Sequence, residues 1–264
     1  TADGSQHGHV AYPIFVFSRK RSDSATTMKL LSESRINYHL VVSEEDYPLY
    51  RDKYPDADIL IVDKKDSISK AKQFIYQRMK EDGFPYVWFL DDDVLSIKHL
   101  EENVSIRSIM SASERFIEDY SNVSILGFNE GVHDSDFKIN QIVRGFTLIN
   151  MQAEDGFGDV EVFEDISFAL KNIKNNFVTV KLEEYSIDYT KGISGGASHI
   201  LMTEAIKSVK KLHELYPEYV GEKEMIFKSR MLPKIYWNNI PTSIRSRQVE
   251  LLITELENKK GKQI

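Results

Sequence analysis

Short apolar runs alternate with helix-like segments through the first 93 residues, and this alternation constrains the fold more than any other feature. The runs have the length and composition of buried strands, and the segments between them are polar or amphipathic. Strands are expected at residues 12–17, 38–42, 59–62 and 86–90, with helices at 26–34, 44–53 and 68–81. This order predicts an α/β fold with a mainly parallel sheet flanked by helices, in which ligands bind beyond the carboxyl ends of the strands.

The rest of the chain continues this pattern and then turns helical. A helix is expected at 105–120, a strand at 123–127, a hairpin at 141–151, a helix at 165–175 and a strand at 177–182. The helix at 68–81 should bury a stripe formed by Ala71, Phe74, Ile75 and Met79. Residues 200–264 are expected to form a helical C-terminal segment broken at its prolines. A length of 264 residues fits one large domain with such an appendix, after a tag or frayed tail at 1–9.

Three consecutive carboxylates, Asp91, Asp92 and Asp93, follow the apolar run 86–90 and precede an expected polar start of a helix. Adjacent carboxylates at the end of a buried strand repel one another unless a cation lies among them. Oxygen ligands suit Mg²⁺ and Mn²⁺, which bind through one or two carboxylates together with substrate phosphates. In an extended stretch Asp91 and Asp93 share a face, so we predict both as metal ligands, with Asp91 also a candidate for the ribose. The alternative is a carboxylate-rich start of a helix, stabilised by the helix dipole.

Cationic and hydroxyl donors follow the first predicted strand. Ser18, Arg19 and Arg21 lie there, and guanidinium groups bind phosphate in a fork, so a nucleotide diphosphate is the expected guest. Because parallel strands end at the same edge of a sheet, these residues should lie close to the aspartates. Lys72 is predicted to reach the same diphosphate. The alternative for residues 18–21 is an ordinary basic surface loop, and the alternative for Lys72 is an exposed lysine without a ligand.

Two later clusters could carry chemistry. Glu164 and Asp165 open a predicted helix, where a carboxylate is either a cap or a catalytic base. Gly195 and Gly196 allow a close approach of the backbone to a ligand. His199 follows them as a metal ligand or acid–base group, although a lone histidine often has only a structural role.

The amino-acid composition restricts the cellular environment and the kinds of partner that the protein can have. The chain has no cysteine, which excludes disulfides and thiolate metal sites and favours a reducing cytoplasm. No run of about 18 apolar residues is present that would span a membrane. The net charge is −7, yet residues 200–264 hold 12 Lys and Arg against 8 Asp and Glu, and the preceding residues hold 22 against 33. This late basic segment is either a phosphate-facing patch or a solvated helix face.

Together these motifs resemble the GT-A (Rossmann-like) glycosyltransferases, and more closely the TET-associated glycosyltransferases, which modify hydroxymethylated pyrimidines in DNA. The resemblance spans about residues 12–199. It is carried, in order, by residues 15–21, by 38–42 followed by Glu44, Glu45 and Tyr50, by 88–93, by Glu164-Asp165 and by Gly195-Gly196. Two positions depart from the pattern: Lys72-Gln73 stands where an Arg-Asn pair is usual, and Lys20 stands where glycine is usual.

The resemblance implies a UDP-sugar donor and a Mn²⁺ or Mg²⁺ ion. The implied metal ligands are Asp91, Asp93 and His199. The implied donor contacts are Ser18, Arg19, Arg21, Glu44, Lys72, Asp91, Asp92, Gly195 and Gly196. Asp165 would be the base of an inverting transfer, with Glu164 the second candidate.

The resemblance also implies an acceptor and a place of action. The acceptor would be a hydroxymethylated pyrimidine in double-stranded DNA, held by the late basic segment in the cytoplasm of a phage-infected bacterium. The glycosyltransferase domain would cover 10–199, with a donor half at about 10–100 and an acceptor half at about 101–199. The alternatives are a glycosyltransferase acting on a protein, glycan or small molecule, a nucleotidyltransferase that releases pyrophosphate, and a binding module without catalysis. The sugar, the base and the oligomeric state stay open.

Overall fold

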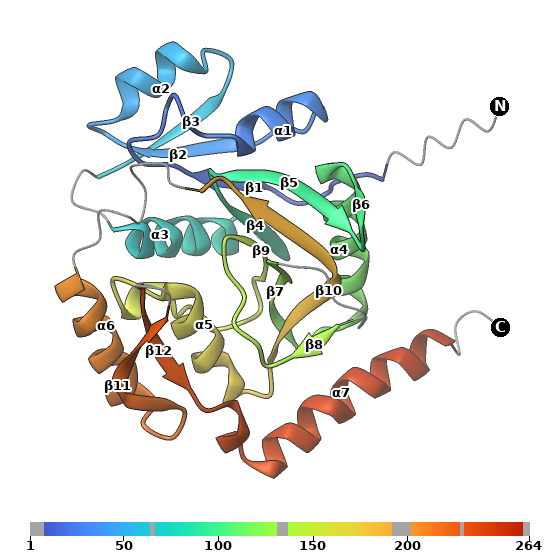
Figure 1. Cartoon of the computed structure of the whole chain (residues 1–264). Helices are drawn as coiled ribbons and strands as arrows, with labels where there is room; N and C mark the ends of the chain where they lie inside the picture. The colour runs from blue at the N-terminus through green and yellow to red at the C-terminus, as the bar shows by residue number, and fades with distance from the viewer. Residues whose placement is uncertain (1–7, 64–66, 131–136, 192–201, 228–229, 261–264) are drawn as a thin grey trace.

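The computed structural model describes residues 8–63, 67–130, 137–191, 202–227 and 230–260 (Figure 1). The strands are β1 (Ile14–Phe17), β2 (His39–Ser43), β3 (Asp58–Val62), β4 (Tyr86–Asp91), β5 (Val94–His99), β6 (Glu102–Asn103), β7 (Val123–Asn129), β8 (Lys138–Ile139), β9 (Phe146–Asn150), β10 (Val178–Tyr189), β11 (Val220–Phe227) and β12 (Arg230–Ile235). The helices are α1 (Thr27–Glu33), α2 (Tyr47–Lys53), α3 (Ile68–Glu81), α4 (Ile106–Asp119), α5 (Glu164–Ile173), α6 (Met202–Leu215) and α7 (Thr242–Lys260), with short 3-10 turns η1 (Phe157–Asp159) and η3 (Trp237–Asn239).

One mixed sheet of ten strands organises the described residues. Its order is β3-β2-β1-β4-β9-β7-β10-β5-β6, and β8 pairs with β10. Strands β1 to β4, β6, β7 and β10 run in one direction, whereas β5, β8 and β9 oppose them. The sheet is therefore mostly parallel, as predicted, and the carboxyl ends of β1, β4 and β10 lie at the same edge.

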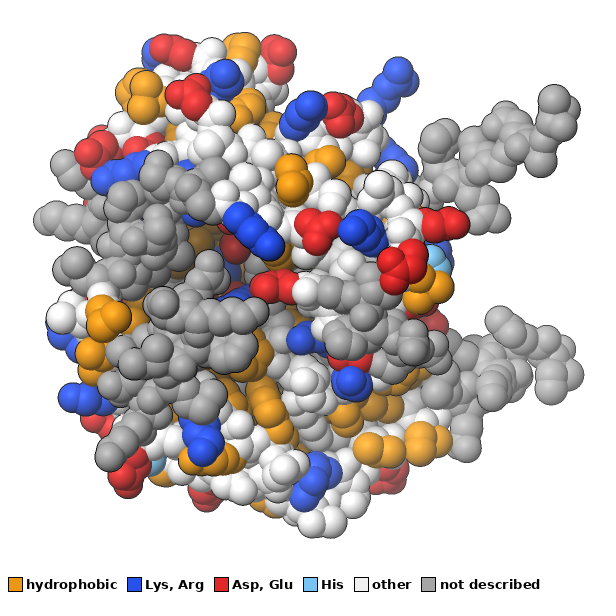
Figure 2. Space-filling model, viewed as in Figure 1, with side chains coloured by type: hydrophobic (Ala, Val, Ile, Leu, Met, Phe, Trp, Pro, Cys, Tyr) orange, Lys and Arg blue, Asp and Glu red, His pale blue; other side chains and the backbone are white. Residues whose placement is uncertain are grey.

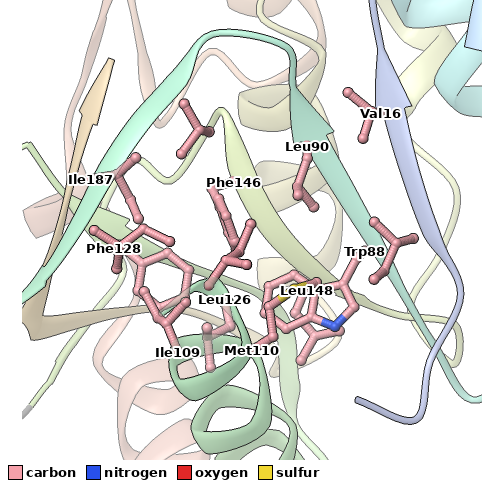
Figure 3. Close-up of a cluster of buried hydrophobic side chains, with 14 of the residues drawn as sticks. Val16, Trp88, Leu90, Ile109, Met110, Leu126, Phe128, Phe146, Leu148 and Ile187 are labelled. Carbon is pink, nitrogen blue, oxygen red and sulfur yellow. The ribbon is translucent and has the colours of Figure 1, made fainter. Parts of the chain in front are cut away.

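Successive residues of β1 and β4 point to opposite faces of the sheet, so each strand serves two cores. Val16 and Trp88 pack in the first core, which includes residues of α1 and α4. Figure 3 shows Trp88, Phe146 and Met110 of α4 in this core, and the rings of Trp88 and Phe146 meet edge to face with centroids 5.5 Å apart. Phe17 packs in the second core, with residues of α3 and α5. The two apolar layers fix the strand ends from both sides.

A third apolar cluster joins the C-terminal elements to α5. Leu170 of α5 packs there with Leu212 of α6, Tyr219 and Val220, and Ile240 follows η3. Figure 1 shows α6, β11 and β12 next to α5. The late segment is thus built onto the helix that begins with Glu164.

The predicted strands and helices of the first 90 residues are confirmed, within a few residues at each end. Four predictions were wrong. The triplet is followed by the strand β5, not by a helix, because Val94–His99 pairs with β10. The expected hairpin at 141–151 holds only β9, which is inserted between β4 and β7.

The other two corrections concern burial and the C-terminal segment. Phe74 is 60% exposed, because α3 is turned so that Lys72 and Tyr76 lie inside. Residues 200–264 are not wholly helical, because β11 and β12 pair as an antiparallel hairpin. Pro233 is tolerated in β12 because this two-stranded sheet leaves one side of each strand unpaired. Among the described residues, no helix has both the length and the apolar character needed to cross a membrane.

Candidate active site

Polar side chains from β1, β4 and β10 meet where these strands end. Phe17, the last residue of β1, is in register with Asp91, the last residue of β4. The predicted proximity of the basic loop and the aspartates is confirmed, because Arg21 Nη1 lies 2.8 Å from Asp92 Oδ1 and 3.2 Å from Asp93 Oδ2. The strand edge therefore carries alternating acidic and basic groups.

Asp92 is the buried member of the triplet. It is 3% exposed, and it accepts hydrogen bonds from Ser18 Oγ and from Arg21. Ser18 Oγ also lies 2.5 Å from Tyr50 Oη of α2. Burial raises the pKa of Asp92, while the bonds from Ser18 and Arg21 oppose this rise. These contacts suit a carboxylate that holds the β1 loop and the β4 turn together.

Helix α2 fixes the shape of the loop after β1. The backbone N–H of Lys20 donates to Asp46 Oδ2 at 3.0 Å, and that of Arg21 donates to Tyr50 Oη at 2.9 Å. Lys20 has φ +54°, in the left-handed region that glycine enters most easily. The loop thus has, at the position where glycine is usual, a backbone conformation in which lysine is strained.

The turn that carries the aspartates is held by its backbone. The amide N–H groups of Thr26 and Thr27 donate to the Asp92 carbonyl at 2.8 and 3.1 Å. Thr27 Oγ1 donates to the carbonyl of Asp91 at 2.6 Å, and the N–H of Thr190 donates to that of Asp93 at 2.8 Å. Because the chain turns at Asp92 and Asp93, the strict strand alternation assumed from the sequence ends at Asp91.

Gly145 and Tyr189 close one side of the turn. The N–H of Asp91 donates to the Gly145 carbonyl at 2.6 Å. Gly145 has φ +78°, and a Cβ there would lie 2.7 Å from Tyr189 Oη and 3.3 Å from Asp91 Oδ2. Burial, and then the charge of Asp91, raises the pKa of Tyr189 well above its usual value. Tyr189 therefore keeps its phenol proton beside the carboxylates.

A buried lysine joins the carboxylates predicted as bases. Lys72 Nζ donates to Glu164 Oε1 at 2.6 Å and to Asp165 Oδ1 and Oδ2 at 3.1 and 3.3 Å. Burial lowers the pKa of Lys72, but the charges of Asp165, Glu164 and Asp91 outweigh it and raise the pKa. Burial raises the pKa of Asp165 to about 6 and that of Asp91 to about 8, and Lys72 opposes both shifts.

The triplet suits a divalent cation through Asp91 and Asp93. Asp93 Oδ1 is buried and has no hydrogen-bond partner among the described residues. The charges of Asp93, Asp165 and Asp92 all disfavour an ionised Asp91, and a cation would relieve this repulsion. The described residues contain no cluster of three metal-binding side chains, so an ion here would need further oxygen ligands, as magnesium does when it binds with substrate phosphates.

The remaining predicted site residues are less tightly placed. Arg19 is half-buried in the loop after β1, and Glu44 is exposed at the end of β2, where its N–H donates to the Val62 carbonyl. Gly195, Gly196 and His199 lie outside the described residues.

Sequence reasoning missed Asp46, Gly145 and Tyr189. Gly145 precedes an apolar run, which is a usable signal of a turn. Tyr189 was missed because the strand that carries it was expected to end at 182, whereas β10 continues to the site.

On the face shown in Figure 2, the described acidic and basic side chains are interspersed. Lys207 of α6 lies 2.9 Å from Glu204, and Arg247 of α7 lies 2.9 Å from Glu250. These two cations are therefore paired within their own helices.

The mostly parallel sheet, its flanking helices and the carboxylate turn at the strand edge define an α/β protein with a polar site at the carboxyl ends of its strands. The family described as TET-Associated Glycosyltransferase matches residues 12–196, so the chain belongs to this family and is a glycosyltransferase.

The comparisons with solved structures and with curated proteins give only weak similarity or none. A protein named as a nucleotide-diphospho-sugar transferase from Desulfovibrio desulfuricans G20 is 9% identical, with a TM-score of 0.35 over 62% of this chain and 74% of that one. The inositol-1-phosphate CTP transferase from T. maritima is 10% identical, with a TM-score of 0.39 over 70% of this chain and 91% of that one. No curated protein matches the sequence.

Proposed function

We propose that this glycosyltransferase moves a sugar from a UDP-sugar to the hydroxymethyl group of a modified pyrimidine in DNA, with the help of Mn²⁺ or Mg²⁺. The observation that carries the proposal is that Lys72, which is paired with Glu164 and Asp165, also lies close enough to Asp91 for their charges to act on each other. Asp91, whose pKa responds to the charge of Lys72, belongs to the strand-end turn. Asp165 begins α5 and contacts Lys72 directly. The strand-end aspartates are suited to binding the donor, and Asp165 is suited to accepting a proton from the acceptor.

On the donor side, Asp91 and Asp93 would hold the metal ion, and Ser18, Arg19, Arg21 and Glu44 would contact the nucleotide. A bound divalent ion neutralises the charge that develops on a diphosphate leaving group. Arg21 is anchored by Asp92, so its guanidinium is ordered before the donor binds. Tyr189 adds a protonated hydroxyl beside Asp91.

On the acceptor side, Asp165 would act as the base. The hydroxymethyl oxygen attacks the anomeric carbon, the bond from this carbon to the diphosphate oxygen breaks, and the hydroxyl proton passes to Asp165. A pKa of about 6 leaves this carboxylate ionised near neutral pH yet more basic than an exposed aspartate. The hydroxymethyl group must enter the site, which favours a target base turned out of the DNA stack.

Product analysis tests the proposal directly. The protein would be incubated with Mn²⁺, individual UDP-sugars and duplexes that differ only in carrying hydroxymethylated or unmodified pyrimidines. We expect UDP release and a hexose or pentose mass increase only on the hydroxymethylated duplex. Pyrophosphate in place of UDP would indicate a nucleotidyltransferase. Equal sugar transfer to a protein, glycan or small molecule, without loss of rate at moderate salt, would refute the DNA acceptor.

A further inference from the structure

Helix α3 contacts residues 153–160, the segment that leads into α5, through a row of hydrogen bonds. Ser69 donates to the carbonyls of Phe157 and Val160, Gln73 to Asp155, and Tyr76 to the carbonyl of Ala153. Ser69, Lys72 and Tyr76 are all buried, so the row lies inside the protein and not on its surface. The start of α5 is therefore positioned by a helix of the predicted donor half.

Lys72 lies in the middle of this row and uses its donors on two carboxylates. Its ammonium has three N–H groups, and three hydrogen bonds lead to Glu164 and Asp165. Lys72 is 3% exposed, and a phosphate that reached its ammonium would have to displace one of these partners. The contacts thus favour a partner within the protein over a diphosphate.

The two carboxylates are held differently. Glu164 takes the shortest contact, at 2.6 Å, whereas Asp165 shares longer contacts between both of its oxygens. The Lys72 ammonium therefore holds Glu164 most closely, and Asp165, with its longer contacts, is the carboxylate that is less tightly bound to the cation. Lys72 is the main cation acting on Asp165, and the charge of Arg144 adds a smaller stabilisation of its ionised form.

We propose that Lys72 is a positioning residue of the transfer reaction, which holds Glu164 as a fixed counter-ion and orients Asp165 as the base. The inference rests on the proposed function and deepens it, since it assigns separate roles to the two carboxylates. It also gives a reason for a lysine at this position. A guanidinium is larger than an ammonium and would have to be accommodated in the same buried space.

The test compares Lys72→Met, Lys72→Arg and the control Lys70→Met, which removes an exposed lysine of the same helix, 3.8 Å from Glu161. Turnover is measured together with the Kd of UDP in the presence of Mn²⁺. For Lys72→Met we expect kcat to fall at least about 100-fold, as for loss of an oriented base, while the Kd of UDP changes less than about twofold. Lys72→Arg should restore part of kcat, and Lys70→Met should match the wild type. A UDP affinity weakened about tenfold with kcat retained would overturn the proposal and make Lys72 a diphosphate ligand.

The two carboxylates provide a second comparison. Asp165→Asn should lower kcat at least about 100-fold, whereas Glu164→Gln should retain more than about a tenth of it. Equal losses in both variants would overturn the division of roles.

A stability cycle separates this inference from the proposed function, because it needs no donor. Lys72→Met leaves two unpaired buried carboxylates, so adding Glu164→Gln should raise the Tm of the single variant. Effects on Tm that simply add would contradict the contact and overturn the inference. If the wild type turns over no UDP-sugar with hydroxymethylated DNA, the proposed function fails, while the cycle still decides whether Lys72 holds Glu164.

Discussion

At the scale of single residues, three adjacent aspartates have three different environments. Asp91 is the last residue of β4, and among the neighbouring charges that of Lys72 has the largest effect on its pKa. Asp92 is buried against Ser18 and Arg21, and Asp93 keeps one oxygen without a partner among the described residues. A turn, and not a strand or a helix, is what separates them, so identical side chains acquire different chemistry.

Asp93→Asn should abolish transfer and its dependence on metal, because the amide keeps the shape of the side chain but not its charge. The free energy of unfolding should change by less than about 1 kcal/mol, since the contact of Asp93 with Arg21 is partly exposed. Turnover with and without Mn²⁺ and a denaturant titration measure the two effects. Asp92→Ala is the contrasting variant, and we expect it to lose about 3 kcal/mol of stability because it removes the buried carboxylate that accepts from both Ser18 and Arg21. Metal-independent turnover by Asp93→Asn would refute the assignment.

Gly145→Ala should damage both stability and activity. The added Cβ would lie 2.7 Å from Tyr189 Oη, and φ +78° is strained for alanine, so a loss of about 1–3 kcal/mol is expected. Thermal unfolding and the UDP Kd measure the outcome. Gly83→Ala is the matched control, because its φ is +81° but nothing lies within 4 Å of the added Cβ. If both variants lost the same stability and neither lost UDP affinity, crowding at Tyr189 would be unimportant.

At the scale of secondary structure, α3 shows how a helix can be predicted correctly while only part of its buried face is. Its bounds, Ile68–Glu81, match the prediction. Ala71 and Ile75 are buried as predicted, but Phe74, which apolar periodicity places in the core, is 60% exposed, and Lys72, predicted to reach a diphosphate, is buried. The reason is that α3 packs on a polar segment and on the carboxylates of α5, and a hydrophobic pattern carries no information about a polar partner.

The difference in burial between Ile75 and Phe74 is testable by substitution. Ile75→Ala should lower the free energy of unfolding by about 3 kcal/mol, since Ile75 is 2% exposed and a cavity remains. Phe74→Ser, next to it, should change it by less than about 0.5 kcal/mol, because surface substitutions have small effects. Urea titrations of both variants check the pair. A loss of 2 kcal/mol or more in Phe74→Ser would mean that this side chain is buried in solution.

The accuracy of prediction for the other strands depended on whether their signals were local in the sequence. The first four strands carry dense apolar runs bounded by polar loops, and these local signals suffice. β5 was mistaken for a helix start because its partner, β10, is about 90 residues away, and pairing over that distance leaves no local signal. The β11–β12 hairpin was missed because the prolines around it were interpreted as helix breaks.

At the scale of the whole molecule, the sheet order assembles the site from distant segments. The rule that ligands bind at the carboxyl ends of parallel strands correctly predicted that Arg21 and Asp92 meet. The same rule could not include Tyr189, because β10 reaches this edge only through its long extension past 182. The Lys72 contacts were also out of reach, since they depend on how α3 and α5 pack.

The crowding of carboxylates at this edge should make stability depend on pH and metal together. Asp91 has a pKa of about 8 in the folded protein and 3.8 as its ordinary value, so the folded state binds more protons between these limits. The stability from this proton is present at low pH and is lost as pH rises through about 8. Without metal, Tm should therefore fall from pH 6 to pH 8.5.

Mn²⁺ should reverse this fall, because it binds the ionised carboxylates of the folded state only. The rise in Tm on adding Mn²⁺ should accordingly be larger at pH 8.5 than at pH 6, where protonated Asp91 competes with the ion. Thermal unfolding at both pH values, with and without Mn²⁺, measures this difference. Asp91→Asn is the control, in which the Mn²⁺ effect should be small at both pH values. An equal Mn²⁺ shift at pH 6 and pH 8.5 in the wild type would show that the ion binds away from Asp91.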